Sequence, residues 1–380
     1  MNKDKYVFAQ MVEFLDNYKF LRIVKKYDGN KYVKHFTCWN QLLTLIFGQL
    51  CNRESLRDLI VALNAHQEKC YHLGVGKHVT RSNLAKANEN RDYRIFEDFA
   101  FYMISEARKK RINDIFKLNG NVYAFDSTWA NFRTHKGGIK IHTLYDVETQ
   151  VPAFIHITEA KINDVKAMDV IPYESGSFYV FDRAYNDYHR LYKIHMMDSF
   201  FVVRAKTNIK AKVLKWKRRL PKNIQSDCEI ELTGFYTQKS YPETIRLVRF
   251  WDEEDEREFI YLTNAKHIQA LQVAELYKNR WQVELFFKWL KQHLKIKKFW
   301  GTSENAVKIQ VYSAIIAYCL VAIMQHDMKL DRSTYEVLQI LGISLTDKTP
   351  LRELFSKTKF NDVKEQSGLD GPNLFSNYNF

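Results

Sequence analysis

The sequence predicts an α/β protein in which a mixed β-sheet is flanked by helices, with a β-rich insertion, an all-helical N-terminal segment and a short helical tail. Three observations predict this class. Apolar residues recur at helical spacing over the first third of the chain, the pattern changes to alternation at Asn119, and helical spacing returns after Ala265. Strands that alternate with helical stretches are typical of mixed sheets covered by helices.

The length of the chain indicates more than one domain, because 380 residues exceed the 250 to 300 or so that one compact core usually holds. The changes of pattern predict five segments: helical residues 1–118, a first part of the sheet core at 119–205, a β-rich insertion at 206–264, a second part of the core at 265–326, and a helical tail at 327–380 with a possible role in dimerisation.

The charge balance favours a polyanionic partner. Lys and Arg number 58 against 44 Asp and Glu, a net charge of +14. Nucleic acid is the leading partner class, and an anionic membrane surface is the rival. A membrane-spanning helix needs roughly 20 apolar residues. The best run, Val311–Met324, has 14 and therefore predicts a buried helix.

Cysteine usage and the first residues bear on the compartment. The five cysteines are scattered without paired spacing, which argues against a disulfide framework or a zinc cluster. Met1–Gln10 is polar and charged and lacks the apolar core of a secretion signal. We expect a protein of the reducing cytoplasm.

The first third of the chain combines helical periodicity with basic clusters. Apolar residues follow helical spacing through Leu42–Leu50, and basic clusters lie at Arg22–Lys26 and Arg108–Arg111. Between them, His78–Arg91 has the short helical stretches of a small DNA-binding unit. Solvated faces of ordinary helices explain the same clusters equally well.

After Asn119 the chain reads as a meander followed by alternating strands and helices. The predicted strands are Val122–Phe125, Ile139–Tyr145, Pro152–Thr158, Phe178–Phe181 and Phe200–Val203, with helices at Asn163–Val170 and Tyr185–Met197. In the insertion, eight basic residues and no acidic one lie between Lys206 and Lys222. The strands that follow are Cys228–Leu232, Thr244–Trp251 and Glu258–Leu262.

Two predicted strands end in the same way. Val122–Phe125 is followed by Asp126, and Phe178–Phe181 is followed by Asp182. Acids at the carboxyl ends of neighbouring buried strands can face one site, because ligands of open α/β sheets bind at that edge. An Asp after an apolar run also opens turns and caps helices, which is the structural alternative.

A helix predicted at Leu271–Lys298 carries a third acid, Glu284, on an ionic face. At about 100° per residue this face is formed by Tyr277, Arg280, Glu284, Lys288, Lys291 and Lys295, and the packing face by Val283, Phe287, Leu290 and Leu294. Pairing of Glu284 with Arg280 and Lys288 is an ordinary helix-stabilising pattern. Five Lys and no acid between Phe286 and Lys298 leave a cationic surplus that suits phosphate.

Asp126, Asp182 and Glu284 together are hard oxygen ligands without a His or Cys cluster, the preference of Mg²⁺ or Mn²⁺ over zinc. Two such ions, about 3.5 to 4 Å apart, stabilise both oxygens of an in-line phosphoryl displacement. The three acids therefore predict phosphodiester chemistry.

At these residues the chain resembles the cut-and-paste insertion-sequence transposases of the DDE class, which have an RNase H-like core. Tyr277, Arg280, Glu284 and Lys291 match the family's Tyr-Arg-Glu-Lys signature in type and spacing. The resemblance covers Asn119–Tyr318 and extends more weakly to the N-terminal helices. Its other elements are Phe125-Asp126-Ser127, Phe181-Asp182-Arg183-Ala184-Tyr185 and Tyr261-Leu262-Thr263-Asn264, which resemble the two aspartate motifs and the strand that closes the family's insertion.

The resemblance implies metal-dependent cleavage at the ends of an insertion sequence and transfer of the 3′-hydroxyl ends into target DNA. It implies that Asp126 contacts two Mg²⁺ or Mn²⁺ ions while Asp182 and Glu284 each hold one. The N-terminal helices would bind the end sequence of double-stranded DNA, and a homodimer would hold two ends. The expected location is the bacterial cytoplasm, in association with the nucleoid.

The resemblance also implies DNA contacts. Tyr277, Arg280 and Lys291 resemble residues that hold phosphates near the cut, and the neighbouring Lys288 and Lys295 extend the same face. Some relatives form a hairpin intermediate in which an aromatic residue stacks on a flipped base. Trp251 is the candidate for that role, with Trp216 and Trp281 as alternatives. Lys136, Lys140 and His142 would add phosphate contacts or form an exposed basic strand face.

The residues leave two alternative functions. A phosphoryl-transfer hydrolase that uses Asp126 as its nucleophile would carry a second Asp two positions on, where this chain has Thr128. A non-catalytic DNA-binding remnant of a transposase, acting as a repressor, would tolerate loss of one of the three acids, and none is missing. Cleavage by the three acids is therefore the leading hypothesis.

Overall fold

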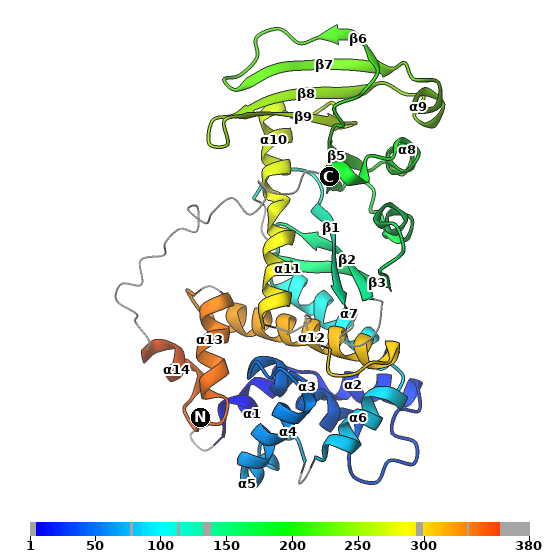
Figure 1. Ribbon diagram of the computed structural model, residues 1–380. Helices are drawn as coiled ribbons and strands as arrows, with labels where there is room; N and C mark the ends of the chain where they lie inside the picture. The colour runs from blue at the N-terminus through cyan, green and yellow to red at the C-terminus, as the bar shows by residue number, and fades with distance from the viewer. Residues whose placement is uncertain are drawn as a thin grey trace.

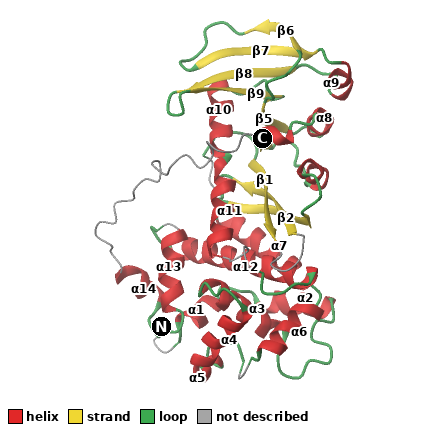
Figure 2. Ribbon diagram, viewed as in Figure 1, coloured by secondary structure: helices red, strands yellow, loops and turns green. Residues whose placement is uncertain are grey.

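A computed structural model of the chain describes residues 5–76, 79–111, 115–131, 138–293, 299–332 and 334–357. The described strands form one nine-stranded sheet, with the N-terminal helices at one end of the molecule and the strands of the insertion at the other (Figures 1 and 2). The mixed α/β class predicted from the sequence is confirmed.

The N-terminal segment is helical, as expected. Side chains of Asp16, Thr37, Ser55 and Thr80 accept backbone hydrogen bonds at helix starts, which satisfies amide groups that the helices themselves leave open. In the described part of residues 1–118, the helices are α1 (Val7–Val12), α2 (Asn17–Lys26), α3 (Cys38–Leu50), α4 (Leu56–Ala65), α5 (Gln67–Cys70), α6 (Arg81–Asn90) and α7 (Arg94–Lys110).

The sheet has the order β3-β2-β1-β4-β5-β9-β8-β7-β6. β1, β2 and β3 form an antiparallel meander, β4 and β5 run parallel to β1, and β9 is antiparallel to β5, so the insertion extends the same sheet. The strands are β1 (Val122–Asn131), β2 (Gly138–Asp146), β3 (Val151–Glu159), β4 (Phe178–Phe181), β5 (Phe200–Arg204), β6 (Ala211–Trp216), β7 (Ile224–Leu232), β8 (Ile245–Asp252) and β9 (Arg257–Thr263).

The structure differs from the predicted elements in several places. β1 continues past Phe125 to Asn131, because residues beyond the apolar run pair with β2. The edge strand β6 lies inside the basic run and was not predicted, since its exposed Lys residues obscure the alternation. The single helix expected from Leu271 is two helices, α10 (Ala270–Asn279) and α11 (Trp281–His293), with a turn at Arg280.

Shorter elements connect the strands. Those between β3 and β5 are the 3₁₀ helices η1 (Asp164–Val170) and η2 (Arg183–Tyr185) and the α-helix α8 (Tyr188–Met196). In the insertion, α9 (Phe235–Ser240) follows β7 and contacts α8. The predicted helix at 163–170 is thus a 3₁₀ helix, and the one predicted at 185–197 begins later, after the Asp187 cap.

Helix α12 (Glu304–Met328) is the central helix between the sheet and the N-terminal helices, and contacts α3, α6 and α7 as well as β3. It contains the predicted buried run Val311–Met324. By length and composition α12 would cross a membrane, but 94% of its apolar window is buried inside the protein, as in a core helix. After it come α13 (Thr334–Ser344) and α14 (Leu351–Lys357).

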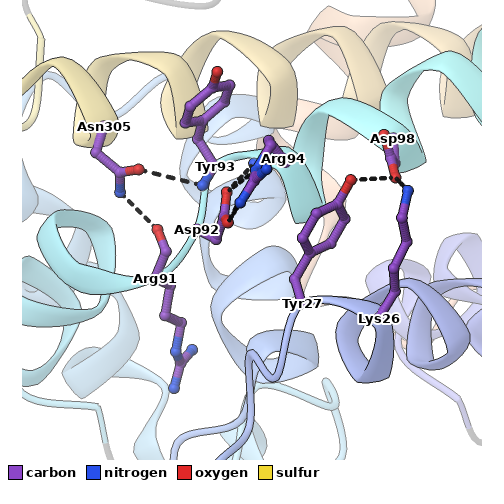
Figure 3. A network of polar contacts seen from close by, with 8 residues as sticks. All are labelled: Lys26, Tyr27, Arg91, Asp92, Tyr93, Arg94, Asp98 and Asn305. Carbon is purple, nitrogen blue, oxygen red and sulfur yellow. Dashed lines mark hydrogen bonds and ion pairs between the residues drawn. The ribbon is translucent and has the colours of Figure 1, made fainter.

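A polar network joins the N-terminal helices to α12 (Figure 3). The amide of Asn305 donates to the carbonyl oxygens of Asn88 (2.9 Å) and Arg91 (2.6 Å), and its oxygen accepts from the Tyr93 amide (3.2 Å). Nearby, Lys26 and Tyr27 of the α2 end donate to Asp98 on α7. These contacts hold the start of α12 against the α6–α7 turn.

The basic cluster at Arg108–Arg111 is mostly engaged within the protein. Arg108 pairs with the buried Asp146 at 2.9 Å and donates to the Tyr123 hydroxyl, and Lys110 pairs with Asp327. This cluster thus serves largely to attach α7 to the sheet and to α12, rather than as a free basic surface. Arg22 and Lys25 of the other cluster are exposed.

Candidate active site

The register of the parallel strands brings the two aspartates to one edge of the sheet. Phe125 of β1 pairs with Phe181 of β4, so the next residues, Asp126 and Asp182, lie side by side where β4 ends. Asp182 precedes η2, yet its side chain makes no capping hydrogen bond. The capping role that would explain an Asp at this position is therefore not what its carboxylate does.

Helices α10 and α11 bring the third acid to this edge. Arg280, at the turn between them, donates from one nitrogen to Asp126 at 3.0 Å and from another to Glu284. One turn earlier, the Tyr277 hydroxyl donates to Asp182 at 3.0 Å. Asp126, Asp182 and Glu284 thus share one polar cluster, connected through Tyr277 and Arg280.

Helix α11 is fixed over the sheet by its apolar face. Val283, Phe287 and Leu290 are buried, as the sequence predicts, and Leu294 lies outside the described residues. The Phe286 ring also packs on Tyr145 of β2, with 5.3 Å between ring centroids. Because this packing sets the rotation of α11, Glu284 faces the edge that carries Asp126.

The electrostatics show that the acids interact. Burial raises the pKa of Asp126 to about 6, against the opposing effects of Arg280 and of the Ser127 amide. The charges of Glu284 and Asp182 raise the pKa of Asp126 further. The Asp126 side chain is only 22% exposed, so its negative charge is poorly solvated.

Tyr277 lies in an aromatic setting that keeps its hydroxyl in the neutral form. Its ring lies 4.8 Å from that of Tyr261 on β9, and burial, followed by the charge of Asp182, raises the pKa of Tyr277 to about 12. A neutral phenol is a hydrogen-bond donor, so Tyr277 orients the Asp182 carboxylate.

The donor chemistry of the cluster suits a hard divalent cation, although the present side-chain arrangement does not surround one. Among the described residues, no three His, Cys, Asp or Glu side chains lie together as a metal site. Asp126 and Glu284 both point to Arg280 instead. The three carboxylates outnumber the two guanidinium groups of this edge, Arg280 and Arg204, and an excess of negative charge favours Mg²⁺ or Mn²⁺.

The predicted phosphate-binding residues are only partly gathered at the acids. Tyr277 and Arg280 contact the acids directly. Lys288 is exposed on α11 and Lys291 is partly buried there, while Lys295 lies outside the described residues.

The candidate stacking tryptophans lie apart from one another. Trp251 is on β8, where its amide donates to the Asn223 carbonyl oxygen, and Trp216 is on the edge strand β6. Trp281 directly follows Arg280 and is 55% exposed, so it lies nearer in the chain to the acids than Trp251 does.

The contacts predicted for the second strand are wrong in the two described positions. Lys140 is 20% exposed, donates to the Ile162 carbonyl oxygen and pairs with Asp164 at 3.1 Å. His142 is fully buried, bonds to Thr158, and burial lowers its pKa to about 4. Lys140 contacts the segment at the start of η1, and His142 packs against side chains of the two neighbouring strands. Lys136 lies outside the described residues.

One residue of this edge, Arg204, was not predicted from the sequence. Val203 of β5 pairs with Phe181, so Arg204 stands beside Asp182 in the same way that Asp182 stands beside Asp126. The charge of Arg204 also acts on Tyr277. A cation after the apolar run Phe200–Val203 was the available signal. Tyr185, the last residue of the second aspartate motif, places its hydroxyl 2.9 Å from that of Ser127, the residue after Asp126 in β1.

Comparison with known proteins gives two family matches. The family described as "Transposase DDE domain" matches residues 118–320, which contain all three acids. A family described as a domain of unknown function (DUF4372) matches residues 3–76, within the N-terminal helices. The DDE match begins shortly after α7 ends, and residues 77–117 lie between the two matches.

Three relatives are named as transposases. A Sinorhizobium fredii protein is 34% identical over 57% of this chain and 60% of its own length. A Geobacillus stearothermophilus protein, named for insertion sequence element IS5377, is 32% identical over 50% of this chain and 51% of its own. A Synechocystis protein, named for element IS4SA, is 28% identical over 80% of this chain and 87% of its own. The chain thus spans only about half to three-fifths of the first two relatives.

Proposed function

Since the chain belongs to the DDE transposase family, we propose that it cuts double-stranded DNA at the ends of an insertion sequence and joins the 3′-hydroxyl ends to target DNA. The observation that carries the proposal is the cluster of Asp126, Asp182 and Glu284 at one sheet edge, assembled from β1, β4 and α11. Three carboxylates held close together repel one another, and a purely structural role would not require that arrangement.

In this proposal Asp126, Asp182 and Glu284 would hold two divalent cations. Bound there, Mg²⁺ or Mn²⁺ would stabilise the attacking and leaving oxygens of phosphodiester cleavage and strand transfer. The chain's own residues do the positioning: the Tyr277 hydroxyl orients Asp182, the Ser127 amide orients Asp126 at 2.8 Å, and packing of α11 orients Glu284.

DNA would approach along the cationic surroundings of these acids. Arg204 and Arg280 lie at the edge itself, and Lys288 and Lys291 continue along α11. Lys295, which the sequence assigns to the same face, lies outside the described residues. Beyond the edge, the basic run Lys206–Lys222 lies around the exposed edge strand β6. Within the described residues only three cations of that run form ion pairs, Lys215, Lys217 and Lys222, so the rest are available to phosphates.

Further parts of the proposal follow from the family. The N-terminal helices would bind the end sequence, and the protein would act as a homodimer on two ends, in the bacterial cytoplasm and at the nucleoid. Trp251 would stack on a flipped base if a hairpin forms, with Trp281 as the better-placed competitor because it adjoins Arg280. DNA flanked by inverted repeats around the coding region would support the whole scheme.

The test is cleavage of a duplex that carries the element's end sequence, with Mg²⁺. We expect Asp126→Asn, Asp182→Asn and Glu284→Gln each to bind the duplex and to lose nicking. Asp169→Asn is the matched control, because Asp169 is an ion-paired carboxylate outside the cluster, on η1. Robust nicking by any of the three cluster variants contradicts the assignment. A wild-type protein that binds but never nicks would favour the repressor alternative.

A further inference from the structure

Arg280 bridges two carboxylates of the acidic cluster. Its guanidinium donates to Asp126 and Glu284 at once, and its side chain is 13% exposed. Two of the three acids are thereby turned towards an arginine of the same chain. In the proposed function these two acids have to face divalent cations instead.

We propose that Arg280 is a built-in counter-ion that withholds Asp126 and Glu284 from divalent cations until its guanidinium transfers to a DNA phosphate. The role rests on the proposed function, because it takes the acids as the cation ligands. Carboxylate and phosphate both match the planar fork of a guanidinium, so Arg280 exchanges one partner for the other. Cation binding then becomes coupled to DNA binding, and the DNA-free protein has little nuclease activity.

Arg280 only partly balances the negative charge of the three acids. Arg280 supplies one positive charge to a cluster of three carboxylates, in which Asp182 and Glu284 already act unfavourably on Asp126. One guanidinium therefore neutralises only part of the cluster. When a DNA phosphate binds Arg280, the net negative charge of the three carboxylates increases. A divalent cation then binds the carboxylates more tightly.

The hydrogen bonds of Arg280 are incomplete, which distinguishes it from a structural arginine. Its Nε is buried and has no hydrogen-bond partner among the described residues. Arg190 on α8 also bridges two carboxylates, Asp169 and Asp187, but there Nε and both terminal nitrogens all donate. A buried donor left open calls for an explanation, and an exchangeable partner provides one.

Transfer of Arg280 requires movement of its side chain alone, because its backbone has helical angles and the helices on both sides are fixed. Arg280 is the turn between α10 and α11, where its amide bonds back only three residues, to the Tyr277 carbonyl oxygen. The two flanking helices are each anchored, α10 through Tyr277 on Asp182 and α11 through its buried face. The side chain of Arg280 can therefore swing while Asp182 and Glu284 stay in place.

The first test measures Mn²⁺ binding to the DNA-free protein. The electron paramagnetic resonance signal of free Mn²⁺ reports how much of the ion remains unbound. If the Arg280 guanidinium contacts Asp126 and Glu284 about nine-tenths of the time or more, removing it tightens Mn²⁺ binding roughly tenfold or more. We expect this gain for Arg280→Gln. Arg190→Gln, the matched control, should bind Mn²⁺ as wild type does, and Asp126→Asn should bind it more weakly.

Arg280→Lys covers the case in which the Gln variant does not fold. Lysine keeps the charge but cannot bridge two carboxylates with a planar fork, so its Mn²⁺ affinity should fall between those of wild type and Arg280→Gln. Unchanged or weaker binding by both Arg280 variants, with Asp126→Asn still weaker than wild type, overturns the counter-ion role and leaves the proposed function standing. If Asp126→Asn has no effect either, the cation assignment itself fails.

The second test adds DNA. A duplex with an already cut end should tighten Mn²⁺ binding to wild type by about the factor that Arg280→Gln produces alone, and should tighten the variant little further. Equal tightening in wild type and Arg280→Gln would show that phosphate does not act through Arg280, and would overturn the transfer step.

Discussion

Replacing Asp126 by Asn should stabilise the metal-free protein, and the gain should grow with pH. Asn resembles the protonated acid in shape and charge, and burial holds the pKa of Asp126 at about 6 against a usual 3.8. Because this folded-state pKa is raised, the wild type has its full stability below pH 3.8. It loses stability as pH rises through 6, whereas the variant carries no such titration.

The magnitude follows from the shift. A difference of about 2.2 units at about 1.36 kcal/mol per unit corresponds to about 3 kcal/mol once the acid is fully ionised. Roughly 1 kcal/mol of this is already lost at pH 4.5, so the difference between variant and wild type should grow by about 2 kcal/mol from pH 4.5 to pH 8. The Asn variant is expected to be more stable because the charged carboxylate that function requires is unfavourable in the folded, metal-free protein.

The assay is urea unfolding in EDTA at pH 4.5 and pH 8, for wild type, Asp126→Asn and Asp169→Asn. Arg190 lowers the pKa of Asp169, so the control should lose stability relative to wild type at pH 8, and that loss should fade as pH falls. An Asp126→Asn difference that stays constant with pH, or that is destabilising at pH 8, would refute the reasoning about charge in the cluster. Mg²⁺ should then stabilise wild type more than the variant.

Three further predictions concern DNA affinity and the scaffold. Lys291→Ala should weaken binding of the end duplex and reduce the slope of log affinity against log salt by about one unit; an unchanged slope in a filter-binding series would assign Lys291 a structural role. Arg246→Met should cost about 3 to 5 kcal/mol in urea unfolding, since it leaves the buried Asp227, 2.8 Å away, without its partner; a loss below about 1 kcal/mol would contradict this. Asn305→Ala should cost about 1 to 3 kcal/mol, because it leaves two carbonyl oxygens and the Tyr93 amide unpaired, and hydrogen exchange should rise at the α6–α7 turn before the sheet; protection unchanged there would argue against a joining role.

Local patterns in the sequence were sufficient for much of the architecture. Apolar runs such as Phe178–Phe181 predicted the buried strands, because a strand covered on both faces needs apolar residues at every position. Asp126 and Asp182 each directly follow one of these apolar runs, which identified them as candidates. Helical spacing placed Glu284 on the ionic face of α11. The long apolar run near residue 311 correctly predicted a core helix.

Other features depended on which segments become neighbours. Arg204 joins the site only because β5 pairs with β4, and His142 is buried among side chains of the neighbouring strands, where it bonds to Thr158 of β3. Neither contact can be predicted from the spacing of residues along the chain. The basic edge strand β6 shows the reverse case, in which pairing with β7 made a strand of residues whose charge obscured the pattern.

The bridge from Arg280 to Asp126 is the clearest example, since the two residues are 154 positions apart. Residue type determined that both are charged, and spacing placed Asp126 after an apolar run and Arg280 on the ionic face of its predicted helix. Folding of α11 onto β1 determined that the guanidinium meets Asp126, because the direction of a side chain depends on the packing of the whole helix. Hydrophobic periodicity is a property of neighbours along the chain, whereas the charge balance of a site arises only when distant segments pack together.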